Sequence, residues 1–90
     1  MKEHELKTWP SFFEAVWDGT KPWEYRRNDR DYQIGDILIL KEWCPEKQQY
    51  SGRTIKSVNG YMLQGKMGMP EGFAIMSLTN IRKFIDGIRV

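Results

Sequence analysis

The stretch from Ile37 to Leu40 constrains the fold more than any other part of the chain, because no apolar run in the chain is longer and it consists of strand-forming residues. An apolar run of this kind is typical of a strand whose two faces are both covered. It is far shorter than the roughly 20 residues that a helix needs to span a bilayer. We therefore expect a central strand from Asp36 to Trp43 and no membrane-spanning segment.

The N-terminal region shows two different periods. Alternation in HELK, from His4 to Lys7, predicts a short half-buried strand. The period then becomes that of a helix from Pro10 to Asp18, since proline is tolerated in a first helical turn and Gly19 is well placed to end the helix. The apolar face of this helix consists of Phe12, Phe13, Val16 and Trp17.

From Trp23 the period is two, as in a strand. We expect Trp23 and Tyr25 to face the core, which displays Glu24 and Arg26 side by side on the opposite surface. The residues from Asn28 to Gly35 include several that favour turn conformations, so this segment is predicted to be a loop.

The segment from Arg53 to Leu63 has strand character but is interrupted by Asn59-Gly60. Two interpretations compete, a tight hairpin at Asn-Gly and one long strand broken by a bulge. We favour the bulged strand, because each arm of the hairpin would be very short.

The remaining segments are two loops, a strand and a tail. Pro45 to Ser51 is a polar turn, and Gln64 to Gly72 is a loop rich in glycine. Phe73 to Leu78 is predicted to be a final core strand. Apolar residues between Ile81 and Val90 fall on one face of a helix, so we expect a short C-terminal helix.

The order of these elements disfavours a parallel, doubly wound sheet, because strands and helices do not alternate repeatedly. We expect an α+β, mainly β fold, in which a small barrel of about five to six strands packs against one helix. Its strand pairs are mixed but largely antiparallel. Closure of the barrel would remove exposed sheet edges. Ninety residues support one modest core, so residues 1–90 are expected to form a single domain.

Composition narrows the class of protein. The chain is 40% hydrophobic and 29% charged, with a mean hydropathy of −0.64, as in soluble globular proteins. The N-terminal MKEHELK lacks the apolar segment of a signal peptide, so we expect a cytoplasmic location. Cys44 is the only cysteine and His4 the only histidine, which leaves no disulfide and no zinc-ligand set. We expect neither a metal nor another cofactor.

Positive charge is concentrated in one segment, although the net charge is only +2 and the pI is near 8.8. Lys21, Arg26, Arg27 and Arg30 lie within ten residues, and lysine and arginine are the residues that bind phosphate backbones. Glu24 cannot bind phosphate, but it can orient the neighbouring cations or accept a hydrogen bond from a base edge. The alternative is that Glu24 and Arg26 form only an exposed ion pair.

Five blocks of sequence carry a resemblance to a known family. They are HELK at His4 to Lys7, GTKPWEYRRNDRDYQIGDILIL at Gly19 to Leu40, EW at Glu42-Trp43, YSGR at Tyr50 to Arg53 and PEGFAIMSL at Pro70 to Leu78. In this order the blocks resemble the ASCH domains of the PUA-like superfamily, in particular a short, uncharacterised bacterial and phage branch. The family pattern G-x-K-x-x-E-x-R is present as Gly19, Lys21, Glu24 and Arg26. The resemblance covers residues 4–78 and leaves residues 81–90 outside.

The resemblance implies a PUA-type barrel with a helix beside a cleft, and a role in binding RNA or a nucleotide-like ligand. The family pattern would place its lysine, glutamate and arginine in that cleft. To these we add one loop arginine and two peripheral cations. The candidate ligand-binding residues are therefore Lys21, Glu24, Arg26, Arg30, Lys7 and Arg53.

Two other classes of function stay open. Some ASCH-like proteins hydrolyse an acylated modified cytidine nucleoside, using the lysine and a threonine at the position that Glu24 occupies here. An enzyme built on this chain would instead use Lys21 and Glu24 as its reactive pair. The other class is an accessory module whose exposed aromatic residues and basic tail bind another protein. Among the four tryptophans, Trp9 is the best candidate for exposure.

Overall fold

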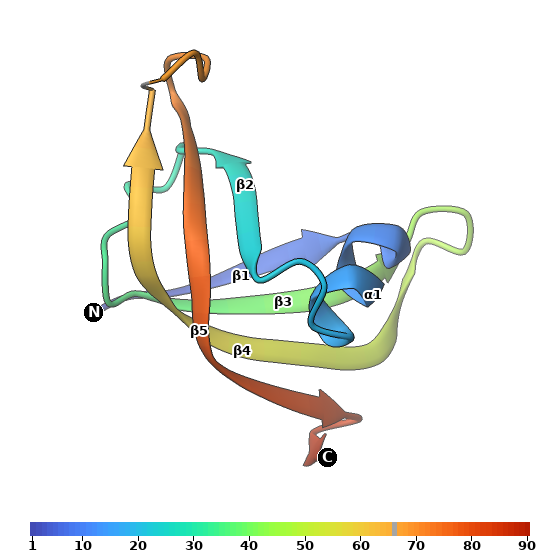
Figure 1. The fold of residues 1–90 in the computed structure, drawn as a ribbon. Coiled ribbons are helices and arrows are strands. Elements are labelled where there is room, and N and C mark those ends of the chain that lie inside the picture. The colour runs from blue at the N-terminus through green and yellow to red at the C-terminus, as the bar shows by residue number, and fades with distance from the viewer. Residues whose placement is uncertain (66) are drawn as a thin grey trace.

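One curled sheet and one helix make up residues 1–65 and 67–90, which the computed structural model describes (Figure 1). The elements are β1 (Glu3–Thr8), α1 (Pro10–Trp17), β2 (Trp23–Arg27), β3 (Ile37–Cys44), β4 (Gln49–Gln64), β5 (Phe73–Ile85) and β6 (Ile88–Arg89). β1 and β3 pair in parallel, and the other pairs are antiparallel. The predicted mainly β fold with one helix is confirmed.

The strand order is β1-β3-β4-β5-β2, with β6 added to β5. The sheet curls into a half-barrel, as Figure 1 shows. β3 lies between β1 and β4, so its apolar run is in the interior of the sheet as predicted. β1 and β2 stand at the two ends of the strand order, and the expected closure of the barrel does not occur through strand pairing between them.

The core lies between the sheet and α1, which buries Phe13 and Val16. The helix occupies the residues predicted for it, and it ends where the Asp18 N–H bonds to the Glu14 carbonyl and Gly19 adopts a φ of +88°. The buried cluster consists of Leu6, Phe13, Val16, Tyr32, Leu38, Leu40, Ile55, Met76 and Leu78. In residues 1–65 and 67–90, no helix has the length and apolar composition needed to cross a membrane.

The predicted orientation of β2 is wrong, although its period of two is right. Glu24 is buried, whereas Trp23 and Tyr25 are 43% and 46% exposed. The cause is the pairing with β5, where Glu24 stands opposite the fully buried Met76. Because the buried face of β5 decides which face of β2 turns inward, the carboxylate points in and the two rings point out.

β4 is one long strand with irregularities, which confirms the bulged-strand interpretation. Its register against β5 shifts between Lys56 and Val58 and again between Asn59 and Met62. A side chain at Gly60 would meet Thr79 Cγ2 at 2.6 Å, so glycine is needed there because the two strands approach closely.

The C-terminal residues form strands, and the predicted helix from Ile81 to Val90 is wrong. β5 continues to Ile85 by pairing with the first half of β4. The chain then turns at Asp86 and Gly87, whose φ values are +49° and +80°. Two consecutive positive φ angles are typical of a tight hairpin turn, and β6 pairs back on β5.

Candidate functional site

A cleft lies along the seam between β1 and β2, where the half-barrel is open. Its volume is about 660 Å³. The end of β1 and the start of α1 supply one wall, and β2 with the start of β5 supplies the other. The lining residues are Lys7, Thr8, Trp9, Phe12, Lys21, Trp23, Glu24, Tyr25, Arg26, Arg27 and Phe73.

Glu24 places a carboxylate in this cleft, and its side chain is only 5% exposed. Oε2 accepts a hydrogen bond of 2.5 Å from Arg26 Nε. Oε1 lies 3.6 Å from Lys21 Nζ, which is an ion pair but too long for a hydrogen bond. Glu24 therefore has one oxygen held by the protein and one that is able to accept a hydrogen bond from a ligand.

Lys21 is fixed next to this carboxylate by the turn that follows α1. Its backbone N–H bonds to the Ala15 carbonyl, and its Nζ donates to the Trp23 carbonyl at 2.8 Å. The ammonium also lies 5.8 Å from the centre of the Trp23 ring. These contacts use part of the donor capacity of the ammonium, which has three N–H groups, and they hold its charge inside the cleft.

Arg26 bridges the seam. Its Nη2 donates to the Lys7 carbonyl on β1 at 2.6 Å and lies 3.4 Å from Thr8 Oγ1, while Nε binds Glu24. A side chain thus satisfies a backbone carbonyl of β1 that strand pairing leaves unpaired. Arg26 both joins the two ends of the sheet and sets the position of Glu24.

Aromatic rings supply the apolar surface of the cleft. Trp9 and Phe12 are each 56% exposed on one wall, and Trp23 and Tyr25 are nearly half exposed on the other. The Tyr25 ring stacks on Phe73 with centroids 5.4 Å apart. Trp9, the best candidate among the tryptophans for exposure, is exposed, whereas the exposure of Trp23 follows from the reversed orientation of β2.

A family described as a domain of unknown function, DUF3850, matches residues 3–78. The chain belongs to this family. It is also 39% identical over 56 residues to an uncharacterised 12.9 kDa protein encoded in the GpA 3′ region of Escherichia phage P2. The match covers 62% of this chain and 50% of the phage protein, so the chain spans about half the length of the curated relative it matches.

The residues that line the cleft lie within the DUF3850 match, which ends at residue 78. Four of the six candidate binding residues come together there, namely Lys7, Lys21, Glu24 and Arg26. Sequence reasoning did not name Phe12, Tyr25 or Phe73 as lining residues. Tyr25 is identified by the pairing of β2 with β5. The buried face of β5 turns Glu24 inward, so the ring of Tyr25 points to the opposite face from the one predicted.

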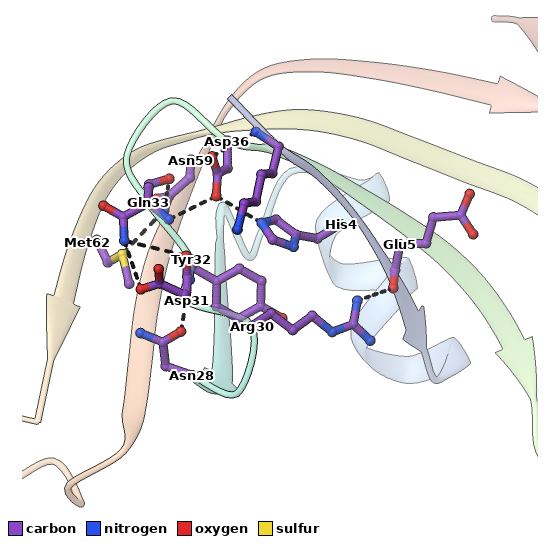
Figure 2. A network of polar contacts seen from close by, with 11 residues as sticks. His4, Glu5, Asn28, Arg30, Asp31, Tyr32, Gln33, Asp36, Asn59 and Met62 are labelled. Atoms are coloured by element: carbon purple, nitrogen blue, oxygen red, sulfur yellow. Dashed lines mark hydrogen bonds and ion pairs between the residues drawn. The ribbon is translucent and has the colours of Figure 1, made fainter.

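Arg30 lies outside the cleft of this DUF3850 chain. Its Nη1 donates to the Glu5 carbonyl on β1 at 2.7 Å, as Figure 2 shows. It therefore repeats, further along β1, the contact that Arg26 makes with Lys7. The two arginines satisfy carbonyls on the unpaired edge of β1, which is a way to protect a sheet edge.

Arg53 also lies outside the cleft, in a partly buried ionic cluster. Its Nε and Nη2 each donate to Glu42 at 2.9 Å, and Nη2 reaches Glu14 of α1 at 3.0 Å. The guanidinium lies 5.2 Å from the Phe13 ring centre and 4.9 Å from that of Trp17. Hydrogen bonds from Arg53 hold the pKa of Glu42 below its ordinary value, with burial opposing them. Arg53 joins α1 to the sheet.

His4 belongs to a second buried network, drawn in Figure 2. Its Nε2 lies 2.9 Å from Asp36 Oδ2, and Tyr32 packs edge-on against the imidazole at 4.7 Å. Burial acts to raise the pKa of Asp36, but hydrogen bonds from His4 and from the backbone N–H groups of Lys2 and Gln33 together lower it. This network anchors the loop before β3 to β1. Within the described part of the chain, no group of three or more His, Cys, Asp or Glu residues is placed to hold a metal ion.

Proposed function

We propose that the cleft binds RNA by receiving one unstacked nucleotide. The observation that carries this proposal is the buried carboxylate of Glu24, whose Oε1 accepts no hydrogen bond from the described residues and lies among exposed aromatic rings. This oxygen lies in the cleft lining without a hydrogen bond from the protein, so it is available to a ligand that brings a donor.

The charge of the lining supports an anionic ligand. Lys7, Lys21, Arg26 and Arg27 line the cleft together with a single carboxylate. Lysine and arginine contact phosphates, and such contacts position a strand without reading its sequence. Because Glu24 cannot bind phosphate, its role in the proposal is to accept a hydrogen bond from an amino group on the edge of a base.

The aromatic rings support a base rather than a phosphate group alone. Single-stranded RNA is bound by stacking its unpaired bases on aromatic side chains, which contributes about 1–3 kcal/mol per base. Trp23 and Tyr25 on one wall and Trp9 on the other offer such surfaces. We also propose that the chain is related to the ASCH domains of the PUA-like superfamily, which its sequence resembles. A cytoplasmic location, as expected from the sequence, is part of the same proposal.

The test is a titration of fluorescein-labelled single-stranded RNA followed by anisotropy at about 50 mM and about 200 mM salt. We expect affinity to fall with salt, and Lys21→Ala to weaken binding and lower the salt slope by about 1. Glu24→Gln should also weaken binding. It should not lower the salt slope, because it removes a negative charge and no cation. Arg89→Ala is the matched control, since Arg89 is exposed and does not line the cleft.

Each variant is first checked by urea denaturation, because Glu24 also holds Arg26. The absence of any anisotropy change for the wild-type protein at the lower salt concentration would overturn the proposal. Equal loss of affinity in Lys21→Ala and Arg89→Ala would do so as well, since it would show a general charge effect and no role for the cleft.

One observation favours a second function, hydrolysis of an N-acylated nucleoside. Lys21 Nζ and Glu24 Oε1 face the same cleft as an ion pair 3.6 Å apart, a distance that one bridging water or a small side-chain shift on substrate binding would bring within reach of proton transfer. Water would cleave the amide C–N bond and give a carboxylic acid and the free base amino group. A hydrolase would release the acid from N-acylated cytidine and lose this turnover in Lys21→Ala, whereas a binding module would show no turnover.

A further inference from the structure

A second set of aromatic rings and cations lies beside the cleft, on β1, β3 and the start of β4. The Trp43 and Tyr50 rings meet edge to face with centroids 4.8 Å apart. Lys7 Nζ lies 4.1 Å from the Trp43 ring centre, and Lys41 Nζ lies 4.6 Å from that of Tyr50. We name these four residues the outer platform. The proposed function makes no use of its two rings.

Lys7 connects the outer platform to the cleft, because it lines the cleft and its ammonium also covers Trp43. Lys7 and Lys41 are cross-strand neighbours in the β1–β3 pair, and Trp43 and Tyr50 are neighbours in the β3–β4 pair. The series of contacts from the cleft to Tyr50 is therefore continuous. It passes over the edge of β1 near Lys7.

The outer platform has the composition of a surface that binds a single strand. Such surfaces combine rings for base stacking with cations that follow the phosphate backbone. Tyr50 is 42% exposed, so its ring is available for contact. The nearest acid in this arrangement is Glu5, whose Oε1 lies 3.7 Å from Lys41 Nζ and offsets part of its charge. Lys7 forms no such ion pair among the described residues, so the cation at the junction keeps its full charge.

We propose that single-stranded RNA bound in the cleft continues past Lys7 onto the outer platform, where a second base stacks on Tyr50. This inference rests on the proposed function of the cleft. It adds that the ligand is a strand of several nucleotides and that the protein has two base-binding positions, the cleft and the outer platform.

The test uses labelled single-stranded RNA of about eight nucleotides, within the range of about 4–16 that one small barrel domain of the OB type covers. Loss of one stacked base corresponds to a weakening of about 5-fold to 150-fold. We expect a change in this range for Tyr50→Ala and Tyr50→Leu. Tyr50→Phe keeps the ring and should retain the wild-type affinity. Tyr61→Ala is the matched control, since Tyr61 is a 63% exposed tyrosine near the other end of β4.

Tyr50→Leu keeps an apolar side chain in contact with Trp43, so it separates loss of the ring from loss of folding, which thermal unfolding monitors. Unchanged affinity in both Tyr50→Ala and Tyr50→Leu, with binding still lost in Lys21→Ala, would overturn the outer platform and leave the cleft proposal intact. Affinity lost equally in Tyr50→Ala and Tyr61→Ala would also overturn it. No binding of the RNA by the wild-type protein would overturn both proposals.

Discussion

Replacement of Arg53 by methionine tests whether this arginine stabilises the fold. Methionine keeps a flexible apolar side chain against Phe13 and Trp17 but removes the guanidinium. The change leaves the Glu42 carboxylate, whose side chain is 9% exposed, with the Ser51 hydroxyl as its remaining hydrogen-bond donor. Removing one partner of a buried ion pair is costly, because an uncompensated charge stays behind.

The magnitude follows from the exposure of the two partners. Breaking a fully buried pair costs about 3–5 kcal/mol, and the Arg53 side chain is 25% exposed, so part of that cost is screened by water. The ion pair with Glu14 adds little, since the Glu14 side chain is 55% exposed. We expect Arg53→Met to lower the free energy of unfolding by about 2–4 kcal/mol at neutral pH.

The loss should depend on pH in a defined direction. The pKa of Glu42 is lowered in the folded protein, so the pair stabilises the fold fully above the ordinary pKa of 4.5 and less as the pH falls through the folded value. The difference between wild type and Arg53→Met should therefore shrink in acid. In Glu42→Gln/Arg53→Met the cost should be smaller than in Arg53→Met alone, because no buried charge is left unpaired.

Urea denaturation followed by circular dichroism measures these differences. Lys83→Met is the matched control, because Lys83 Nζ also lies over the Trp17 ring, at 5.5 Å, but forms no ion pair among the described residues. A loss below about 1 kcal/mol for Arg53→Met, or one equal to that of Lys83→Met, would refute the reasoning. RNA affinity of Arg53→Lys should equal that of wild type, since Arg53 does not line the cleft.

Two further predictions concern the other polar network and the bulged strand. Asp36→Asn should destabilise the protein by about 1–3 kcal/mol at neutral pH. The pKa of Asp36 in the folded protein lies below its ordinary value of 3.8. The stability difference between wild type and Asp36→Asn, measured by urea titration, should therefore shrink as the pH falls below 3.8. A difference that stays constant with pH would contradict this prediction. Gly60→Ala should cost about 1–3 kcal/mol, because the added Cβ would lie 2.6 Å from Thr79 Cγ2. An unchanged melting temperature would show that β4 and β5 separate at this point without strain.

Elements marked by clear local signals were predictable from the sequence. The helix from Pro10 has a proline start, an apolar face and a glycine stop, and the β3 run has no polar residue to suggest another structure. The tail was not predictable from apolar spacing alone. Asp86-Gly87 is a strong signal for a tight turn, but its two residues interrupt the alternation, and the apolar positions on either side then coincide with helical spacing.

The orientation of β2 shows a different limit. Its sequence indicates the period of a strand but not which face is buried. One face carries two aromatic rings, and the other carries a glutamate and an arginine that can pair with each other. The rings of Trp23 and Tyr25 favour burial by composition. The carboxylate of Glu24 is buried instead because Arg26 and Lys21 accompany it. The face that turns inward is set by the pairing with β5, where Glu24 stands opposite the buried Met76, and local sequence does not encode that long-range pairing.

The same contacts explain why a cleft lies at this position. Two paired strands lie about 4.8 Å apart, whereas Arg26 and Arg30 join loop and strand to β1 through long side chains and hold the seam without strand pairing. The guanidinium groups satisfy carbonyls that a closing strand would otherwise satisfy, and the space left between β1 and β2 is the cleft. Arg26 is then part of the fold and of the proposed site together, so loss of RNA binding in Arg26→Ala has two causes. Among the described residues, the Lys21 ammonium donates to the Trp23 carbonyl and pairs with the Glu24 carboxylate, both within its own segment. Lys21→Ala breaks no contact across the seam, so it reports on the ligand more directly than Arg26→Ala does.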